Sequence, residues 1–378
     1  MRFLHIADLH LGKQLMGYSL LEDQAYILKE ILEIAGKEEA EGILIAGDIY
    51  DKAVPPAEAV ALLDTFLTQL TKENRKVFLI SGNHDNAQRV SFGRSVMQKA
   101  EVYISPVFSG LPEKIVMEDR WGKLNVFLMP YIRPAMVRAA YDREDVHSYE
   151  DAFRLVLEHM KTEGQLLPGE RNVLLAHQFL TGAEPSESEE FTVGGLENIS
   201  AALLEDFDYV ALGHIHRAQK VGRESVRYSG TPLKYSFSEV NHKKSVTIVE
   251  VEEKGNVRVQ TRDLIPLRDL VQLKGTYDEL TAADFYKDRN REDYYRIILT
   301  DEEEVFQAVA KLRLIYPNLM RVEYENLRSM ESRVLESSEE LQKKEPMDFL
   351  EELFLLQNNQ DMTEDQVAYA RKVLEEVL

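Results

Sequence analysis

The sequence predicts an α/β fold, specifically an α+β sandwich in which two facing sheets are flanked by helices. Two observations lead to this prediction. In the first part of the chain, short apolar runs alternate with stretches of helical periodicity, which is typical of parallel strands joined by crossover helices. Farther on, two runs of alternating polarity, about 245–251 and 256–263, are typical of an antiparallel pair and would close the second half of the sandwich.

Three strands and two helices are predicted in the N-terminal part of the chain. The strands are the apolar runs Arg2–Ala7, Gly42–Ala46 and Lys76–Ile80. Apolar residues at helical spacing predict the intervening helices over roughly 27–35 and 60–70, and the second of these follows a proline pair suited to a helix start. This order of elements is that of two consecutive βαβ units.

The middle of the chain continues the alternation less regularly. Apolar runs predict strands at Leu124–Met129, Asn172–Ala176 and Tyr209–Leu212, and a helix is predicted over 149–163. The last two of these strands lead directly into segments that contain histidine. We therefore expect them to belong to the same functional region as the N-terminal strands.

Changes in composition divide the chain into four segments. Residues 1–267, which end just after Pro266, form the first. Residues 268–327 contain strand-like runs around a helix and predict a small α+β unit. The stretch 328–346 is rich in Ser, Glu and Lys, as flexible linkers are, and 347–378 predicts two amphipathic helices.

Composition limits the class of protein. The 378 residues carry a net charge of −21, with 45 Lys+Arg and 66 Asp+Glu, which argues against a protein that coats nucleic acid through general positive charge. Binding to DNA would need a local basic patch or a partner. The absence of cysteine excludes disulfides, thiolate metal sites and a cysteine nucleophile. No signal-peptide pattern or membrane-spanning apolar stretch is present, so a cytoplasmic protein is expected.

Five polar motifs follow apolar runs and carry the chemistry. They are Asp8-Leu9-His10, Gly47–Asp51, Gly82–Asp85, Ala176–Gln178 and Gly213–His216. Sites in such sheets form at the carboxyl ends of the strands, so the motifs are expected to meet there. Asp8 and His10, two residues apart, share one face of a strand or its exit. A mixture of carboxylate, amide and imidazole ligands suits a pair of divalent metal ions.

Each motif alone has a simpler explanation. A Gly-Asp pair after a strand is common in turns, and Asp85 after His84 has the place of a turn residue or helix cap. The combination argues against coincidence, because five of the nine histidines lie in these motifs and every motif lies at a predicted strand end. His5 instead has the place of a structural residue.

The motifs resemble those of the calcineurin-like metallophosphoesterase superfamily, whose order is D-x-H, G-D-x-x-D, G-N-H-[DE], H and G-H-x-H. The match covers residues 1–260 in full order. Within the superfamily, Leu4–Gly12 and Ala46–Asp51 are similar to the nuclease subunits of bacterial complexes that process DNA ends with a coiled-coil ATPase. The resemblance implies a four-layer nuclease core over 1–267, a DNA-contacting capping domain over 268–327, and ATPase-binding helices over 347–378.

The resemblance also implies a set of site residues. Asp8, His10 and His216 would hold one metal ion, Asn83, His177 and His214 the other, and Asp48 would bridge the two. Two Mn²⁺ ions are expected, although ligands of this kind also accept iron, magnesium and zinc. His84 is expected to be catalytic, either by stabilising the transition state or by protonating the leaving oxygen. Asp51 is expected to orient His84.

The function implied by the resemblance is a metal-dependent DNA nuclease. It would act as a double-strand exonuclease and a single-strand or hairpin endonuclease in DNA repair, recombination and replication. A homodimer within a heterotetramer with the ATPase, located at the nucleoid, is expected. The alternative is a phosphatase or phosphodiesterase that acts on a small nucleotide or a phosphoprotein. A binding module without activity is disfavoured, because no residue of the ligand set is missing.

Overall fold

The computed structural model describes residues 1–186 and 198–325, together with eleven positions of the C-terminal segment, namely 347, 350, 351, 354, 362, 363, 366, 367, 369, 370 and 373. The predicted linker 328–346 lies outside the described residues. Of the predicted C-terminal helices, the described residues between Met347 and Phe354 and between Gln366 and Val373 are helical. No helix in this described part of the chain is long and apolar enough to span a membrane.

The chain forms two compact units. The first consists of Met1–Gln272 with Glu292–Arg296, and the second of Leu273–Arg291 with Ile297–Leu378. The limits predicted from composition, with a boundary at 267/268, stay a prediction.

The first sheet of the first unit has six strands, four of them parallel. Its order is β14 (Val257–Asp263), β13 (Ser245–Val251), β1 (Arg2–Ile6), β4 (Gly42–Ala46), β5 (Lys76–Ile80) and β6 (Val102–Ile104). The strands β1, β4, β5 and β6 are parallel neighbours, whereas β13 and β14 are antiparallel. The three predicted N-terminal strands are therefore adjacent, as two βαβ units require.

The second sheet repeats this plan. Its order is β11 (Gln219–Val221), β12 (Arg223–Tyr228), β10 (Tyr209–Gly213), β9 (Arg171–His177), β8 (Gly122–Leu128) and β7 (Glu113–Asp119). The four central strands are parallel, and the edge strands β7 and β11 are antiparallel to their neighbours. The three predicted strands of the middle of the chain form β8, β9 and β10, but the composition of β7, β11 and β12 did not predict them.

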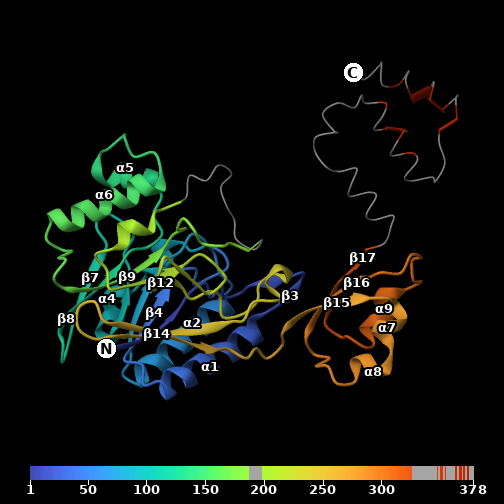
Figure 1. Cartoon of the computed structure of the whole chain (residues 1–378), viewed down its shortest axis with the longest axis horizontal. Helices are drawn as coiled ribbons and strands as arrows, with labels where there is room; N and C mark the ends of the chain where they lie inside the picture. Colours follow the sequence, from blue (N-terminus) through green and yellow to red (C-terminus); the bar gives the residue numbers. More distant parts are fainter. Residues whose placement is uncertain are drawn as a thin grey trace. The chain divides into compact units, whose positions relative to one another are not determined.

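Successive side chains of a strand point to opposite faces of its sheet, so each sheet packs against other elements on both faces. Val126 of β8 packs with Phe3 and Phe78 in a core between the two sheets, whereas its neighbour Phe127 packs on the other face with Phe153. That outer face is covered by α5 (Pro134–Tyr141) and α6 (Tyr149–Thr162), and the first sheet is covered by α1 (Leu21–Lys37) and α2 (Ala57–Lys72) (Figure 1). The predicted sandwich is thus confirmed as four layers, helix, sheet, sheet and helix.

The second unit is small and α+β. It contains β17 (Leu319–Tyr324) and parts of β15 (Leu270–Gly275) and β16 (Tyr294–Leu299), and the three strands form one sheet in the order β15, β16 and β17. Three short helices accompany the sheet, α7 (Tyr277–Thr281), α8 (Ala283–Tyr286) and α9 (Ala308–Arg313). Thr276 and Glu279 form a capping box that starts α7, and the Tyr316 hydroxyl donates to the carbonyl of Leu280 at 2.7 Å.

Short elements complete the described chain. They are β2 (Gln14–Leu15), β3 (Tyr18–Ser19), α3 (Ala87–Val90), α4 (Arg94–Met97) and the 3₁₀ turns Gln98–Ala100, Ala201–Leu204 and Phe237–Glu239. The first four lie close in sequence to the polar motifs at the ends of β1 and β5.

Candidate metal centre

The two sheets come into close contact where the polar motifs lie. A Cβ added to Gly213, at the end of β10, would lie 1.9 Å from the carbonyl oxygen of Ala46 at the end of β4. A Cβ on Gly82 would lie 2.1 Å from Oδ1 of Asp48. The glycines of the G-N-H and G-H motifs are therefore required by close packing against the end of β4. They bring the ends of β4, β5 and β10 to one point.

Four of the predicted ligands have left-handed backbone. The φ angles are 53° for Asp8, 43° for His10, 48° for Asp48 and 99° for His214. Residues other than glycine pay about 1–3 kcal/mol for such a conformation, and they persist where surrounding structure enforces them. Here the amides of Asp8 and His10 donate to the carbonyls of Gly47 and Asp48, each at 3.0 Å. The strain is the cost of turning several side chains into one small volume.

Asp48 lies at the centre of the cluster. Its Oδ2 is 3.3 Å from Nε2 of His177, 3.8 Å from Nε2 of His10 and 4.0 Å from Nε2 of His84. Within the described residues, two groups of candidate ligand atoms lie within 4.8 Å of one another, His10-Asp48-His84 and Asp8-Asp48-His177. Asp48 belongs to both groups, which is the position that a bridging ligand needs.

The remaining predicted ligands surround this carboxylate. Oδ1 of Asn83 is 3.0 Å from Nε2 of His177 and 3.0 Å from Nδ1 of His214. On the other side, Nε2 of His10 is 3.2 Å from Nε2 of His216. All seven predicted metal ligands are therefore brought together, while their division between two ions stays a prediction.

One buried polar atom indicates that the cluster suits a cation. Oδ2 of Asp8 is buried and has no hydrogen-bond partner. Burial raises the pKa of the Asp8 carboxyl to about 7, and burial lowers the pKa of His10 well below its usual value. A divalent ion favours the ionised carboxylate and the neutral imidazole, so it would offset the effect of burial on Asp8 and act in the same direction as burial on His10. The residues present therefore fit a metal site.

The charge of the cluster points the same way. Burial lowers the pKa of His177, but the carboxylates of Asp48 and Asp8 outweigh burial and raise this pKa to about 9. The side chains of His177, Asp8 and Asp48 are each no more than 3% exposed. Negative charge is thus concentrated where water cannot screen it, and bound cations would neutralise it.

His84 differs from the other histidines of the cluster. Its side chain is 26% exposed, compared with 1% for His10 and 0% for His177. Its Nδ1 lies 3.1 Å from the main-chain carbonyl of Asp51, which can only accept, so Nδ1 carries the proton. Nε2 is then directed toward Asp48, and the ring stands at the open side of the cluster.

The carboxylate of Asp51 has a different neighbour. Its Oδ1 pairs with Nζ of Lys13 at 2.8 Å and lies 3.9 Å from Nδ1 of His10. The contact of Asp51 with the ring of His84 comes from its main-chain oxygen. The predicted orienting role is therefore available to the main chain of Asp51, and a role for its carboxylate stays a prediction.

Sequence reasoning missed several residues that fix the motifs. The Asp85 carboxylate accepts from the amides of Ile49, Tyr50 and Gly82 at 2.9–3.0 Å, and so ties the second motif to the third. The fourth position of the G-N-H-[DE] pattern was the available signal for this role. Tyr235 holds the first motif through the carbonyl of Leu9, at 2.5 Å, but no local pattern singles it out.

A buried ion pair lies against His216. Oε1 of Glu239 is 3.2 Å from Nδ1 of His216, and Nζ of Lys244 donates to Oε2 of Glu239 at 2.5 Å. Burial raises the pKa of the Glu239 carboxyl, but Lys244 and His216 outweigh burial and hold this pKa well below its usual range. Glu239 is therefore an ionised carboxylate inside the protein. Neither residue lies in a strand-end motif, so the sequence did not indicate them.

Comparison with known proteins agrees with this geometry. Residues 1–218 match the family model of calcineurin-like phosphoesterases. The chain belongs to the calcineurin-like phosphoesterase family. Calcineurin-like phosphoesterases hydrolyse phosphoesters with divalent metal ions, and the cluster around Asp48 is the place in this member where those ions fit. Residues 266–358 match a second family model, described as the type 5 capsule protein repressor C-terminal domain.

Among individual proteins, this calcineurin-like phosphoesterase is similar to the SbcD subunit of nuclease SbcCD from Staphylococcus epidermidis. The two are 32% identical over 322 residues, which are 85% of this chain and 84% of the relative. The resemblance to SbcD-type nucleases expected from the first and second motifs is thus confirmed.

Two solved structures are more distant. A dimetal phosphatase from Danio rerio is 10% identical with a TM-score of 0.38, covering 70% of this chain and 96% of that one. A protein of Thermus thermophilus is 13% identical with a TM-score of 0.40, covering 69% of this chain and 98% of that one.

Proposed function

We propose that this calcineurin-like phosphoesterase is a metal-dependent DNA nuclease of the SbcD type, active as a double-strand exonuclease and a single-strand or hairpin endonuclease. The observation that carries the proposal is the extent of the likeness to the SbcD subunit of nuclease SbcCD, which covers 85% of the chain and not the phosphoesterase core alone. The separate match of residues 266–358 supports it, because a phosphatase needs only the core.

Seven residues would hold the metal ions. Asp8, His10 and His216 would bind one ion, Asn83, His177 and His214 the other, with Asp48 between them. Mn²⁺ is the ion we propose for both positions. When bound, such a pair of ions lowers the pKa of water and neutralises charge on phosphate oxygens.

The protein itself contributes His84. Because its Nδ1 is occupied by the main-chain oxygen of Asp51, its Nε2 is the atom that meets a phosphodiester entering from the open side. With a second proton on Nε2, the resulting imidazolium would stabilise negative charge on the phosphate or give that proton to the leaving sugar oxygen. The walls of buried ligands exclude water beneath the substrate, which strengthens this interaction.

The test compares substrates of two classes. The purified chain with Mn²⁺ is given linear duplex DNA, a DNA hairpin, a nitrophenyl phosphodiester, a small nucleotide and a phosphopeptide. We expect DNA to be cleaved, with chelation by EDTA abolishing the activity. The alternative, a phosphatase or phosphodiesterase, would be indicated by turnover of the nucleotide or phosphopeptide while both DNAs remain intact.

We also propose that the C-terminal segment 347–378 docks on the coiled coil of an SbcC-type ATPase. Its described residues surround an apolar groove of about 470 Å³, with Leu350, Phe354 and Val373 among the lining residues. Tyr369, another lining residue, is 72% exposed. Apolar side chains arranged in this way on amphipathic helices suit a helical partner.

A homodimer within the heterotetramer is proposed on similar grounds. Phe92 is 82% exposed and Val60 is 45% exposed, and both line one surface hollow. A large exposed apolar side chain at such a hollow favours contact with a second copy. The assembly would act in DNA repair, recombination and replication, in the cytoplasm at the nucleoid. Sedimentation of the Phe92→Asp variant tests the homodimer. We expect the variant to sediment as a monomer.

A further inference from the structure

We propose that Glu239, held by Lys244, is a positioning residue for the metal ligand His216. This inference rests on the metal-dependent function proposed above and adds a residue that lies outside the ligand set. It follows from how the His216 side chain and main chain are held.

Two contacts fix the ring of His216. The Glu239 carboxylate can only accept, so Nδ1 of His216, 3.2 Å away, carries the proton. Nε2 of the same ring then keeps its lone pair, and this atom faces Nε2 of His10 at 3.2 Å inside the cluster. A lone pair on Nε2 is what a metal ion requires of a neutral imidazole.

Lys244 holds both members of this contact. Its Nζ donates to Oε2 of Glu239 at 2.5 Å and to the main-chain carbonyl of His216 at 3.0 Å. A third bond, at 2.6 Å, goes to the hydroxyl of Thr231. The ammonium group therefore links the carboxylate to the main chain of the ligand that the carboxylate orients.

Burial argues that the pair serves more than stability. The side chain of Glu239 is 0% exposed and that of Lys244 is 7% exposed. Removing two charges from water costs several kcal/mol per ion, and a well-packed apolar pair is often as stable or more so. A buried carboxylate next to a ligating histidine is instead the usual means of fixing its tautomer and increasing its basicity.

His177 provides the contrast within the same cluster. Its Nδ1 lies 2.8 Å from the main-chain carbonyl of Ala46, a neutral acceptor. Glu239 carries a full negative charge, so it stabilises positive charge near the His216 ring more strongly than a neutral carbonyl can stabilise it near the His177 ring. Loss of the Glu239 charge should therefore weaken the ion bound by His216 more than the ion bound by His177.

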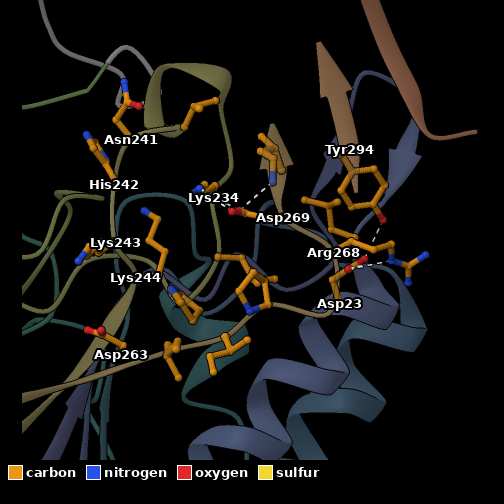
Figure 2. Close-up of a pocket in the computed structure, with 18 residues that line it drawn as sticks. Asp23, Lys234, Asn241, His242, Lys243, Lys244, Asp263, Arg268, Asp269 and Tyr294 are labelled. Atoms are coloured by element: carbon orange, nitrogen blue, oxygen red, sulfur yellow. Dashed lines mark hydrogen bonds and ion pairs between the residues drawn. The ribbon is translucent and has the colours of Figure 1, made fainter. Parts of the chain in front are cut away.

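The surroundings of Lys244 make a clean experiment possible. Lys244 also lines a pocket of about 380 Å³ in the first unit, together with Lys234 and His242 (Figure 2). The pocket wall includes none of the candidate metal ligands. A methionine at position 244 has free space beside it, so the substitution removes the charge without overpacking.

The experiment measures Mn²⁺ binding by calorimetry and by electron paramagnetic resonance in the full chain. We expect Glu239→Gln to weaken one of the two Mn²⁺ sites about 10–100-fold while the other keeps its affinity. At limiting Mn²⁺, the spin-coupled signal of the paired ions should give way to the six-line signal of a single ion. The double variant Glu239→Gln/Lys244→Met, which leaves no unpaired buried charge, should show the same loss.

Asp208→Asn is the matched control. Asp208 is also a buried carboxylate, paired with Lys254 at 3.0 Å and bonded to the amide of Asn172 at 2.6 Å, but it touches no candidate ligand. The Asp208→Asn substitution should lower the melting temperature of the protein and leave both Mn²⁺ affinities unchanged. If Glu239→Gln or the double variant bound both Mn²⁺ ions with wild-type affinity, the role of Glu239 would be overturned, but the proposed function would not be affected. A wild-type chain that binds no Mn²⁺ would overturn the proposed function as well.

Discussion

The strand-end cluster and the C-terminal segment are built in opposite ways. In the cluster, polar side chains such as Asp8 and Asp48 are buried on left-handed backbone, and glycines let the main chains touch. In the segment, apolar side chains such as Tyr369 are exposed around a groove. Chemistry thus depends here on main-chain geometry that tolerates little change. The proposed partner binding would instead depend on an exposed surface that supplies none of the residues of the cluster.

The largest effect is expected from the residue at the centre of the cluster. Asp48→Asn removes the carboxylate that lies within 4.0 Å of His10, His84 and His177, so both ions lose a ligand. We expect nuclease activity to fall by about 10³-fold or more and metal content to fall below two ions per chain. Elemental analysis and cleavage of linear duplex DNA measure the two quantities. Asp145→Asn, which changes an exposed carboxylate between α5 and α6, serves as control. If Asp48→Asn retained two ions, the bridging role of Asp48 would be refuted.

A second substitution separates chemistry from metal binding. His84→Gln removes the partly exposed imidazole and leaves the seven predicted ligands in place, so metal content should stay at the wild-type value. Cleavage should be abolished, which means a loss of about 10²–10⁴-fold for a group that transfers or shares a proton. Loss of metal from His84→Gln would make His84 a ligand instead.

Asp51→Asn sharpens the same experiment. Its main-chain oxygen still meets Nδ1 of His84 after the substitution, whereas its ion pair with Lys13 is lost. We expect at most about a tenfold loss of cleavage, because the main-chain contact that orients His84 is kept. A loss as large as that of His84→Gln would assign the orienting role to the carboxylate.

A fourth substitution tests the close contact between the ends of β10 and β4. Gly213→Ala places a methyl group where the carbonyl oxygen of Ala46 lies 1.9 Å away, so the ends of β10 and β4 must separate. We expect a loss of about 3 kcal/mol in the free energy of unfolding, at the upper end for overpacking. Urea denaturation measures it. Gly169→Ala is the control, since nothing lies within 4 Å of the added Cβ there, and equal stability of both variants would contradict the close-contact argument.

The sequence predicted the cluster more fully than its supports, for a physical reason. Predicted ligands such as Asp8 and His216 follow apolar runs closely, and strand ends of parallel sheets meet, so local patterns were enough to predict that these side chains lie together. Glu239 lies 23 residues from His216 and reaches it only through tertiary packing. The same holds for Tyr235 and the carbonyl of Leu9. Such contacts leave no periodic trace in one sequence.

The fold shows the same limit. Central strands such as β4 and β9 are buried along their whole length and read as continuous apolar runs. The missed strands β7, β11 and β12 are partly exposed and mix polar with apolar residues, so composition alone did not reveal them. Such strands owe their place to pairing with a neighbour, which is a tertiary effect.

The smallest effect on DNA cleavage is expected from a deletion of the C-terminal segment. Removing residues 346–378 takes away the apolar groove around Leu350 and Val373 but no residue of the strand-end cluster. Cleavage of DNA with Mn²⁺ should therefore stay within about twofold of the full chain, because none of the groups that hold metal or face the phosphate is changed.

Co-purification with an SbcC-type ATPase should be lost, since the deletion removes the helical surface proposed to meet the coiled coil. A matched substitution, Tyr369→Asp, places a charge on the 72% exposed ring position and should weaken binding without a deletion. Retained binding of the ATPase by the shortened chain would place its docking surface elsewhere. Lost cleavage would show that the two regions are less independent than their construction indicates.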